Sequence, residues 1–381
     1  HFLRAGALAS LAGLSPAAAA SVHAERRPRH TRPPRARQRP GRSGEVLLNA
    51  NENPLGLGPR AREAVAAALD EANRYPRERR DALVARLAER HGVQPENIVL
   101  GNGSTEVLQM AVQALAQPRA RLVVADPTFE DVPRYREPFP YRLVKVPLDF
   151  RYAHDVARMR GEAEAERRPS VVYLCNPNNP TGTLTPSAEI DDWIVDAPES
   201  VFFIVDEAYF EFVDDPGYWS AVKWIDQRPN LLVARTFSKV YGMAGMRLGY
   251  GIAHADTVAR LEEFIGHNNA NQLALAAALA SLDDEAHVRA SLDLNRRSLA
   301  VVTETLDELG LGYLPSSTNF VMHQIGRADL GEYIARFREQ GIRVGRPFPP
   351  MLGYNRLSLG MPDDMARWAE TLRAFRARGW V

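Results

Sequence analysis

A lysine that follows a hydroxyl residue is the first candidate for chemistry in this chain. Lys239 comes directly after Ser238 at the end of an apolar segment, and Arg247 stands eight positions further on, with glycines between them. A lysine amine can form a Schiff base with an aldehyde, and hydroxyl and guanidinium groups can bind phosphate. The spacing therefore indicates an enzyme that holds an aldehyde cofactor covalently through Lys239. We expect the phosphate of that cofactor to be bound by Thr236, Ser238 and Arg247.

Pyridoxal phosphate is a cofactor of this kind, and a second segment suits its phosphate. Residues 101–105 read Gly-Asn-Gly-Ser-Thr and open a predicted helix. Free backbone N–H groups and the positive end of the helix dipole make such a turn a phosphate site. Ser104 and Thr105 are therefore further candidates for binding the phosphate, although an ordinary capped helix start has the same pattern.

A carboxylate and three other side chains suit the ring of the cofactor. Asp206 ends an apolar predicted strand, where a buried carboxylate needs a partner such as a protonated pyridine nitrogen. The rigid turn at 176–182 can present the Asn179 amide to the phenolate oxygen of the ring, and Tyr209 can donate to the same oxygen. Phe129 can stack on the ring, unless it belongs to the core.

The acidic pair at 206–207 has a second interpretation. Glu207 should face away from the ring, because successive residues of a strand alternate between its faces. A metal site is the rival interpretation of the pair, but no histidine stands near it in the sequence. The one cysteine of the chain, Cys175, belongs to no zinc-type cluster and can form no internal disulfide. We therefore expect no metal.

An arginine near the C-terminus is the candidate for substrate binding. Arg356 lies in a predicted strand at 355–360, and a guanidinium forms bidentate pairs with a carboxylate or a phosphate. There it would hold the anionic group of a substrate beside the reacting carbon; the alternative is an exposed charge on an edge strand. Arg346 and Arg343 are candidates for contacting the far end of the substrate.

The elements that must position these side chains alternate between strands and helices from Glu45 onward. Near-continuously apolar, β-branched segments of this kind are typical of strands buried on both faces of a mostly parallel sheet. Ligands of such sheets bind at the carboxyl ends of the strands, where the candidate residues stand. The predicted strands are 98–100, 122–125, 171–174, 201–205, 231–234 and 248–252, and a helix is expected from Thr105 to about Ala116.

The C-terminal part has a different pattern. It predicts a smaller α/β domain with helices at about 284–309, 330–340 and 363–378 and strands at 319–322, 342–344 and 356–359. We expect four regions in total: an export-signal-like segment and linker at 1–44, a segment at 45–73 that joins the small domain, a large cofactor-binding domain at 74–282 and the small domain at 283–381.

Composition excludes several classes of protein. The formal net charge is zero, and residues 1–44 carry a net +8, so that the remaining 38 basic and 46 acidic residues leave −8 on the rest. There is no basic-aromatic stripe of the nucleic-acid-binding kind, and no apolar run approaches the ~18 residues of a membrane span. A content of 45% hydrophobic residues is enough for a large core. We expect no nucleic-acid partner and no stable membrane span.

The first residues are similar to an export signal. An apolar stretch from Ala5 to Leu14 is followed by small residues and by Val22-His23-Ala24, which has the form of a signal-peptidase site. This resembles the end of a twin-arginine signal, which would place the protein in the periplasm; otherwise it is cytoplasmic. The alternative is a disordered extension, and residues 26–42, with eight arginines and four prolines, predict a flexible linker.

Together the segments resemble the fold type I, class I/II aminotransferases, and most closely their histidinol-phosphate aminotransferase branch. The likeness covers essentially Glu45 to the C-terminus, and the order of the motifs makes it specific. It implies a seven-stranded type of sheet between helices, with a smaller C-terminal domain. The motifs that carry it are Asn49–Gly56, Arg74-Tyr75-Pro76, the turn at 101–105, the loop at 176–182, Asp206–Tyr209, Ser238-Lys239 and Arg356–Gly360.

The resemblance implies a role for each matching residue. Lys239, Asp206 and Tyr209 would be catalytic, with the Lys239 amine moving a proton between the substrate and the cofactor in a ping-pong transamination that a 2-oxo acid completes. Asn53 would contact the substrate. Tyr75 would reach the cofactor phosphate of a neighbouring subunit, so a homodimer is implied.

The substrate and two other functions stay open. Arg356 suits the carboxylate of an amino acid as well as the phosphate of histidinol phosphate, and Leu55 is apolar where many histidinol-phosphate enzymes carry an aromatic residue. The segment at 345–350 is similar to branch members that act on aromatic amino acids. The alternatives to transamination are a decarboxylase of the threonine-phosphate type and a non-catalytic module that binds pyridoxal phosphate.

Overall fold

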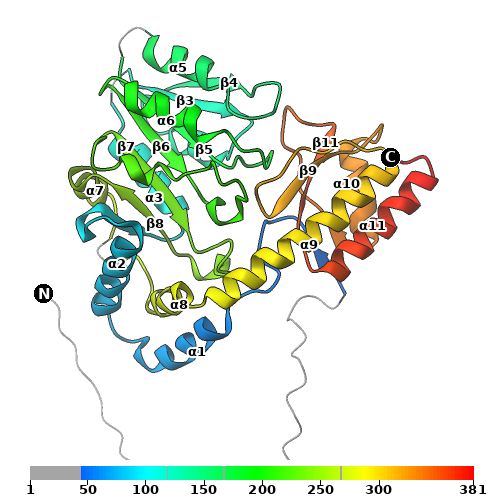
Figure 1. The fold of residues 1–381 in the computed structure, drawn as a ribbon, viewed down its shortest axis with the longest axis horizontal. Helices are drawn as coiled ribbons and strands as arrows, with labels where there is room; N and C mark the ends of the chain where they lie inside the picture. The colour runs from blue at the N-terminus through cyan, green and yellow to red at the C-terminus, as the bar shows by residue number, and fades with distance from the viewer. Residues whose placement is uncertain (1–43, 118, 166–167, 267) are drawn as a thin grey trace, which may run out of the picture. The chain divides into compact units, whose positions relative to one another are not determined.

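A seven-stranded sheet is the largest sheet of the computed structural model, which describes residues 44–117, 119–165, 168–266 and 268–381. Its order is β2-β8-β7-β6-β5-β3-β4; β8 pairs antiparallel with β2 and β7, and the other pairings are parallel. This confirms the expected α/β fold with a mostly parallel sheet (Figure 1). The strands are β2 (Ile98–Gly101), β3 (Arg121–Asp126), β4 (Arg142–Pro147), β5 (Ser170–Cys175), β6 (Val201–Asp206), β7 (Leu231–Thr236) and β8 (Gly249–Ala253).

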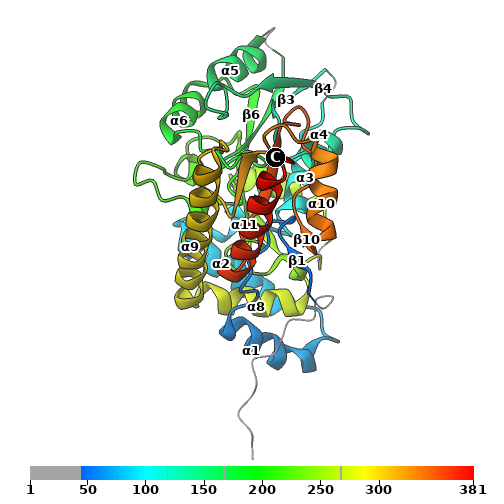
Figure 2. The same ribbon diagram turned by 90° about the vertical axis from the view of Figure 1, so that its right-hand side faces the viewer.

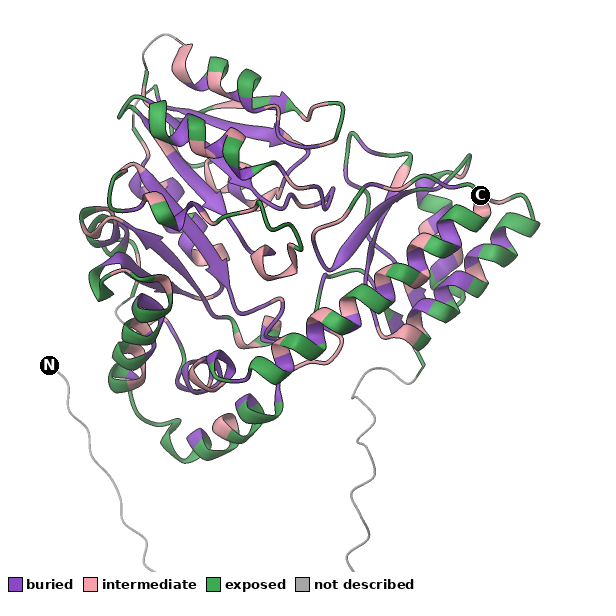
Figure 3. Cartoon of the chain, in the orientation of Figure 1, coloured by how far each residue is buried: buried purple, intermediate pink, exposed green. Residues whose placement is uncertain are grey.

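Helices cover both faces of this sheet, because the strands are apolar on both sides. In β3, Leu122 and Val124 belong to one core, and Val123 and Ala125 belong to the core on the other face. Full burial of a valine or leucine contributes about 1.5–3 kcal/mol. Figure 3 shows the strands buried and the outer sides of the helices exposed. The helices of this part are α2 (Arg77–His91), α3 (Ser104–Ala114), α4 (Asp131–Tyr135), α5 (Val156–Glu164), α6 (Ser187–Asp196), α7 (Ala255–Glu262) and α8 (Gln272–Leu282).

Strand β4 is absent from the sequence-based prediction. It lies at the edge of the sheet and pairs with β3. Most of its residues are exposed or half-buried, and Arg142 and Lys145 interrupt the apolar pattern that marks the central strands. Charged side chains are common on edge strands because they hinder pairing with another chain. The strand was therefore missed because its sequence lacks the apolar continuity of a buried strand.

Two small sheets and three helices make up the C-terminal part. β9 (Phe320–Gln324) pairs antiparallel with β11 (Tyr354–Ser358), and β10 (Ile342–Arg343) pairs parallel with β1 (Val46–Leu47). The bounds of β9, β10 and β11 lie within two residues of the predicted ones, whereas β1 was not predicted. The helices α9 (Glu285–Leu309), α10 (Leu330–Glu339) and α11 (Pro362–Ala377) contribute to a core separate from those of the large sheet, and Figure 2 shows α9 beside α11.

The N-terminal segment contacts both parts of the described chain. β1 pairs with β10, whereas α1 (Pro59–Ala68) packs against α8, and α9 runs from there to the C-terminal part (Figure 1). The domain limits at 73/74 and 282/283 stay a prediction. Short 3₁₀ helices occupy some of the connections: η1 (Leu69–Glu71), η2 (Pro95–Asn97), η4 (Phe210–Phe212), η5 (Ala221–Trp224) and η6 (Ala244–Met246).

The predicted export signal and its linker lie outside the described residues, apart from Gly44. Among the helices of the described chain, none has both the length and the apolar character that crossing a bilayer requires.

Candidate active site

The carboxyl ends of three neighbouring parallel strands open into a cavity of ≈ 290 Å³. Cys175, Asp206 and Thr236 end β5, β6 and β7 and line one side of it, and residues of the C-terminal part line the other side. This is where open α/β sheets bind ligands. All but three of the predicted site residues line the cavity: Ser104, Thr105, Phe129, Asn179, Asp206, Tyr209, Thr236, Ser238, Lys239, Arg247, Arg346 and Arg356.

One end of the cavity has the features of a phosphate site. Helix α3 begins there at Ser104. Its N-cap residue is Gly103, which has no side chain that could accept a hydrogen bond from the first N–H groups of the helix. Arg247 Nη1 donates to Ser238 Oγ over 3.4 Å and Nη2 donates to Asn102 O over 3.2 Å, so the guanidinium lies beside the helix start. Gly103 has a φ of +75°, and a Cβ at this position would collide with Arg247 Nη2. Free N–H groups, hydroxyls and a guanidinium can together bind a dianion.

Lys239 lies between this phosphate site and the opposite side of the cavity. Its Nζ donates to Asn51 O over 3.4 Å and stands 5.4 Å from the centre of the Tyr209 ring. Burial, and next the positive charge of Arg356, lower the pKa of the Lys239 ammonium from 10.5 to about 8. No carboxylate within the described residues forms an ion pair with it. An amine with this pKa can exchange a proton near neutral pH.

Asp206 is buried at the end of β6. Its Oδ2 accepts from Tyr173 Oη over 2.9 Å, and its Oδ1 accepts from the backbone N–H of Ala208 over 3.1 Å. Burial nevertheless raises the pKa of this carboxyl from 3.8 to about 6. A buried carboxylate that faces a cavity and has neutral donors as its partners can accept a cationic ring N–H.

Glu207 points away from this cavity, as predicted. It is buried on the other side of the sheet, where its Oε2 lies 2.6 Å from Arg235 Nη2 and accepts from Ser220 Oγ over 2.8 Å. Within the described residues there is no group of histidines, cysteines and carboxylates that could hold a metal ion. The pair at 206–207 therefore divides between two faces of the sheet, as the alternation of strand residues requires.

Arg356 projects from β11 into the same cavity. Its Nη1 donates to Asn179 Oδ1 over 2.7 Å and its Nη2 donates to Asn49 O over 3.0 Å, while its buried Nε has no hydrogen-bond partner in the described chain. Burial lowers the pKa of its guanidinium from 12.5 to about 10. No carboxylate of the described residues pairs with it. A buried guanidinium with neutral partners has the capacity to bind an anion.

Three of the predicted residues, Asn53, Tyr75 and Arg343, do not line the cavity, and Arg343 pairs with Glu45 instead. The side-chain amide of Asn53 donates to Val240 O over 2.7 Å and to Ser291 Oγ over 2.8 Å, and its Oδ1 accepts from the N–H of Leu55. These contacts hold the Asn53 side chain outside the cavity lining, and its predicted contact with the substrate stays a prediction. Tyr75 is 83% exposed, and its predicted contact with a second subunit stays a prediction.

Two side chains that were not predicted, Asn51 and Glu130, line the cavity, and a third, Tyr173, supports Asp206 from behind it. Asn51 has a φ of +53° and donates from Nδ2 to Tyr209 Oη over 3.0 Å, and Tyr173 donates to Asp206. Glu130 lines the rim and binds Arg346 through two contacts, of 2.7 and 3.3 Å. The run of asparagines at 49–53 was a signal that could have indicated Asn51. Nothing in the local sequence distinguishes Tyr173 from an ordinary core residue.

A model of the family described as aminotransferase class I and II matches residues 43–371 of this chain. The chain belongs to the class I and II aminotransferases. Two relatives are the histidinol-phosphate aminotransferase 2 of Ralstonia nicotianae (strain ATCC BAA-1114 / GMI1000) and the histidinol-phosphate aminotransferase 1 of Cupriavidus pinatubonensis (strain JMP 134 / LMG 1197). The first is 38% identical over 87% of this chain and 89% of the relative, and the second is 36% identical over 87% and 88%.

Solved structures agree with this family. A protein from Erwinia carotovora atroseptica SCRI1043 has 38% identity and a TM-score of 0.88 over 91% of this aminotransferase and all of that chain. The histidinol-phosphate aminotransferase of Sinorhizobium meliloti, solved in complex with pyridoxal-5'-phosphate, has 27% identity and a TM-score of 0.80 over 87% of this chain and 91% of that one. Pyridoxal phosphate is the cofactor of the family.

The cavity of this aminotransferase fits that cofactor. The start of α3 with Arg247 suits its phosphate, the buried carboxylate of Asp206 suits a protonated ring nitrogen, and Lys239 suits its aldehyde. When bound, pyridoxal phosphate supplies an aldehyde carbon that takes up an amino group and a ring that stores electrons.

Proposed function

We propose that this aminotransferase transfers the amino group of a donor that carries an anionic group to a 2-oxo acid, with Lys239 as its general acid and base. The observation that carries the proposal is the convergence of Lys239, Asp206 and Arg356 in one cavity. None of the three has an ion-pair partner in the described chain, although all three lie in a largely buried site. Such unpaired charges are costly unless a ligand compensates them.

The ring and phosphate of the cofactor would be held by separate groups of residues. Asn179 and Tyr209 would bind the phenolate oxygen, Phe129 would stack on the ring and Asp206 would accept the ring N–H. The proposal is supported by the place of these four residues around the same cavity. Asn179 in addition keeps its Nδ2 free for donation, while its Oδ1 accepts from Arg356. The phosphate would be bound by Ser104, Thr105, Thr236, Ser238 and Arg247.

Lys239 would move the proton of the reaction. With a pKa of about 8, a fraction of its amine is neutral at pH 7 and can accept the proton from the donor's α-carbon. It would then deliver that proton to the aldehyde-derived carbon of the cofactor. Arg356 would hold the substrate's anionic group in the cavity that Lys239 also lines, so that the α-carbon is directed to Lys239.

The anion that Arg356 binds would be a carboxylate or a phosphate. A guanidinium accepts both through paired N–H groups, and its unpaired buried Nε is available for such a contact. The names of the relatives support histidinol phosphate as one candidate donor. Amino acids with an α-carboxylate are the other class, and the site geometry suits both.

The function is tested by a single-turnover screen of the purified holoenzyme. Individual donors are added without a 2-oxo acid while the visible absorbance of the cofactor is followed: histidinol phosphate, aromatic and aliphatic amino acids, glutamate and arginine. We expect at least one to convert the cofactor to its aminated form, and the converted compound names the donor class. A holoenzyme that no donor converts, or release of carbon dioxide without need for a 2-oxo acid, would reject transamination.

We propose further that the enzyme is a homodimer in which Tyr75 reaches the cofactor phosphate of the neighbouring subunit. The proposal is supported by the exposure of this ring, 83% in a single chain, which leaves it available to a partner. Analytical ultracentrifugation should give twice the mass of the chain. A Tyr75→Phe variant should keep that mass but hold the cofactor more weakly, and an unchanged cofactor affinity would reject the contact.

We also propose that residues 1–24 direct export, which would place the enzyme in the periplasm. The support is the apolar stretch and the Val22-His23-Ala24 site of the sequence. Fractionation of bacteria that express the full chain should find, in the periplasm, a form that begins at Glu25. An intact chain confined to the cytoplasm would establish the cytoplasmic alternative.

A further inference from the structure

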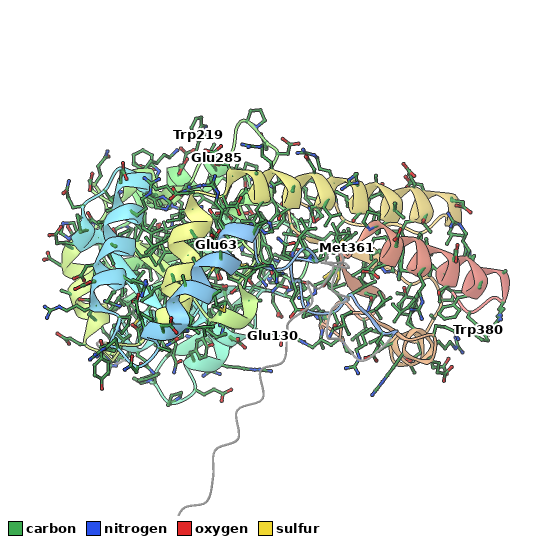
Figure 4. The ribbon with its side chains drawn as sticks, turned by 90° about the horizontal axis from the view of Figure 1, so that it is seen from below. Glu63, Glu130, Trp219, Glu285, Met361 and Trp380 are labelled. Carbon is green, nitrogen blue, oxygen red and sulfur yellow. The ribbon has the colours of Figure 1, made fainter. Side chains whose placement is uncertain are left out.

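The rim of the cavity carries an ion pair that joins the two parts of the chain. Glu130 follows β3 and begins the turn into α4, and Arg346 follows β10 in the C-terminal part. Arg346 Nη2 lies 2.7 Å from Glu130 Oε2 and Nη1 lies 3.3 Å from Oε1, which is a bidentate pair. In Figure 4 Glu130 lies at the surface, beside the border between the large-sheet part and the C-terminal part.

The two arginines of the cavity differ in their partners. Arg356 is buried and donates to an amide and a backbone carbonyl, whereas Arg346 is half-exposed and is neutralised by a carboxylate. Both guanidinium groups lie against the same aromatic ring, at 4.1 Å (Arg346) and 4.5 Å (Arg356) from the centre of Phe348. The inner end of this side of the cavity is therefore cationic, and the outer end is neutral and partly apolar.

This difference in charge bears on which substrates suit the cavity. A donor with a single anionic group places it at Arg356 and leaves its remaining atoms beside Phe348 and the neutral ion pair. A donor with a second carboxylate meets Glu130 there, and it must displace this side chain from Arg346 or remain next to a like charge. Specificity of this kind comes from the penalty on the wrong ligand.

We propose that Glu130 is a specificity-determining residue, which occupies Arg346 so that the cavity favours substrates with one anionic group over dicarboxylates. The inference rests on the proposed function, because it takes Arg356 as the site of the first anion. In the described chain Glu130 forms ion pairs with Arg346 and, at 3.8 Å, with Arg134, and it forms none with Lys239. It acts on the cavity through the charge of Arg346, which lines it. A glutamine at this position keeps the size of the side chain and removes its charge.

The first test measures binding without turnover. Calorimetry on the holoenzyme compares maleate, a dicarboxylate that lacks an amino group, with 3-phenylpropionate, a monocarboxylate. Glu130→Gln should bind maleate on the order of tenfold more tightly than the wild type and bind 3-phenylpropionate within about twofold of it. The matched control is Asp131→Asn, which removes the neighbouring carboxylate; this residue pairs with Arg134 and does not line the cavity. The control should bind both compounds as the wild type does.

A double variant distinguishes the release of Arg346 from the general effect of removing one negative charge near the cavity. Adding Arg346→Gln to Glu130→Gln should remove the gain for maleate, because the freed guanidinium is what would bind the second carboxylate. A gain that persists in the double variant, an equal gain in Asp131→Asn, or no gain in Glu130→Gln would each overturn the proposal.

The same variants distinguish this inference from the proposed function. In single-turnover experiments the rate with glutamate relative to that with phenylalanine should rise on the order of tenfold in Glu130→Gln. If the wild type converts donors but neither this ratio nor the maleate affinity changes, the inference fails and the function stands. If no donor is converted but maleate affinity rises as expected, the function fails and the role of Glu130 in anion selection stands.

Discussion

Tyr173 Oη donates to Asp206 Oδ2 over 2.9 Å at a place where both side chains are buried. The two residues lie near the ends of neighbouring strands: Tyr173 stands two positions before Cys175, the last residue of β5, and Cys175 is in register with Asp206, the last residue of β6. Burial makes the Asp206 carboxyl hard to ionise and so raises its pKa. The hydrogen bond from Tyr173 is the largest of the contributions that lower this pKa again. Tyr173 therefore helps to keep Asp206 in the charged form that a protonated ring nitrogen needs.

Removal of that hydroxyl should shift the pH dependence of the enzyme. In Tyr173→Phe the carboxyl loses the donor that favours its charged form, so the pKa of Asp206 should rise above about 6. The acid limb of the single-turnover rate should move to higher pH by about one unit. The control is Tyr141→Phe, which removes a buried hydroxyl that donates to Val112 O, outside the cavity. Identical pH profiles for wild type and Tyr173→Phe would contradict the role.

Lys239→Ala should abolish turnover. The variant lacks both the amine that binds the cofactor and the general base, and loss of a general base alone lowers rates by about 10²–10⁴-fold. Borohydride should fix the cofactor to the wild-type protein at Lys239 and leave the variant unlabelled. Lys223→Ala, which removes a lysine that pairs with Asp191 outside the cavity, should react as the wild type does. Substantial transamination by Lys239→Ala would exclude the assignment.

Arg356→Gln should weaken donor binding much more than it changes the fold. Loss of a buried charged hydrogen-bonding partner costs about 2–5 kcal/mol of binding, which corresponds to about 30-fold or more in KM. The matched variant is Arg343→Gln, since Arg343 pairs with Glu45 and does not line the cavity. KM values and melting temperatures of both variants give the comparison. Equal KM values in the two variants would show that Arg356 does not bind the substrate.

Removal of the cofactor should expose a cost of burying Asp206. The pKa of its carboxyl is about 6 in the folded chain, against 3.8 for an ordinary aspartate. Between these two pH values the folded state therefore binds a proton that the unfolded state has lost. The protonated Asp206 carboxyl therefore stabilises the cofactor-free enzyme below pH 4. As the pH rises through 6, about 3 kcal/mol of the free energy of unfolding is lost.

Asp206→Asn, which does not titrate, should lack this loss. We compare the free energy of unfolding of the cofactor-free wild type with that of the variant at pH 4 and at pH 7. From pH 4 to pH 7 the wild type should lose that amount relative to the variant. The exposed Asp192→Asn serves as the control. A difference that does not depend on pH would show that the carboxyl of Asp206 titrates normally.

Gly103→Ala should impair cofactor binding specifically. A Cβ at this position would collide with Arg247 Nη2, and the φ of +75° is unfavourable for alanine. Gly310→Ala carries a similar backbone cost, with a φ of +64°, but has open space around the added carbon. Both variants should lose about 1 kcal/mol or more of stability. Only the first should bind pyridoxal phosphate more weakly in a fluorescence titration, and equal affinities would argue against a phosphate site at this turn.

The residue types and their order along the chain were enough to predict most strands of the sheet and the chemistry of the site. Apolar strands that each end in a polar residue predict where the ligand binds, because parallel strands direct their carboxyl ends to one edge. Asp206 was identified in this way, Lys239 from its spacing to Ser238 and Arg247, and Arg356 from the affinity of a guanidinium for anions. The alternation of strand residues placed Glu207 on the opposite face. Strand β4 escaped because an edge strand needs no continuous apolar pattern.

Only the tertiary structure shows which of several residues of the same type in one segment faces the cavity. Asn51 rather than Asn53 lines it, because Ser358 of β11 binds the backbone N–H and Oδ1 of Asn51 and so sets the orientation of that segment. The contacts of Tyr173 with Asp206 and of Glu130 with Arg346 join residues 33 and 216 positions apart. Such partners depend on how distant elements pack, and no local pattern of residues records that packing.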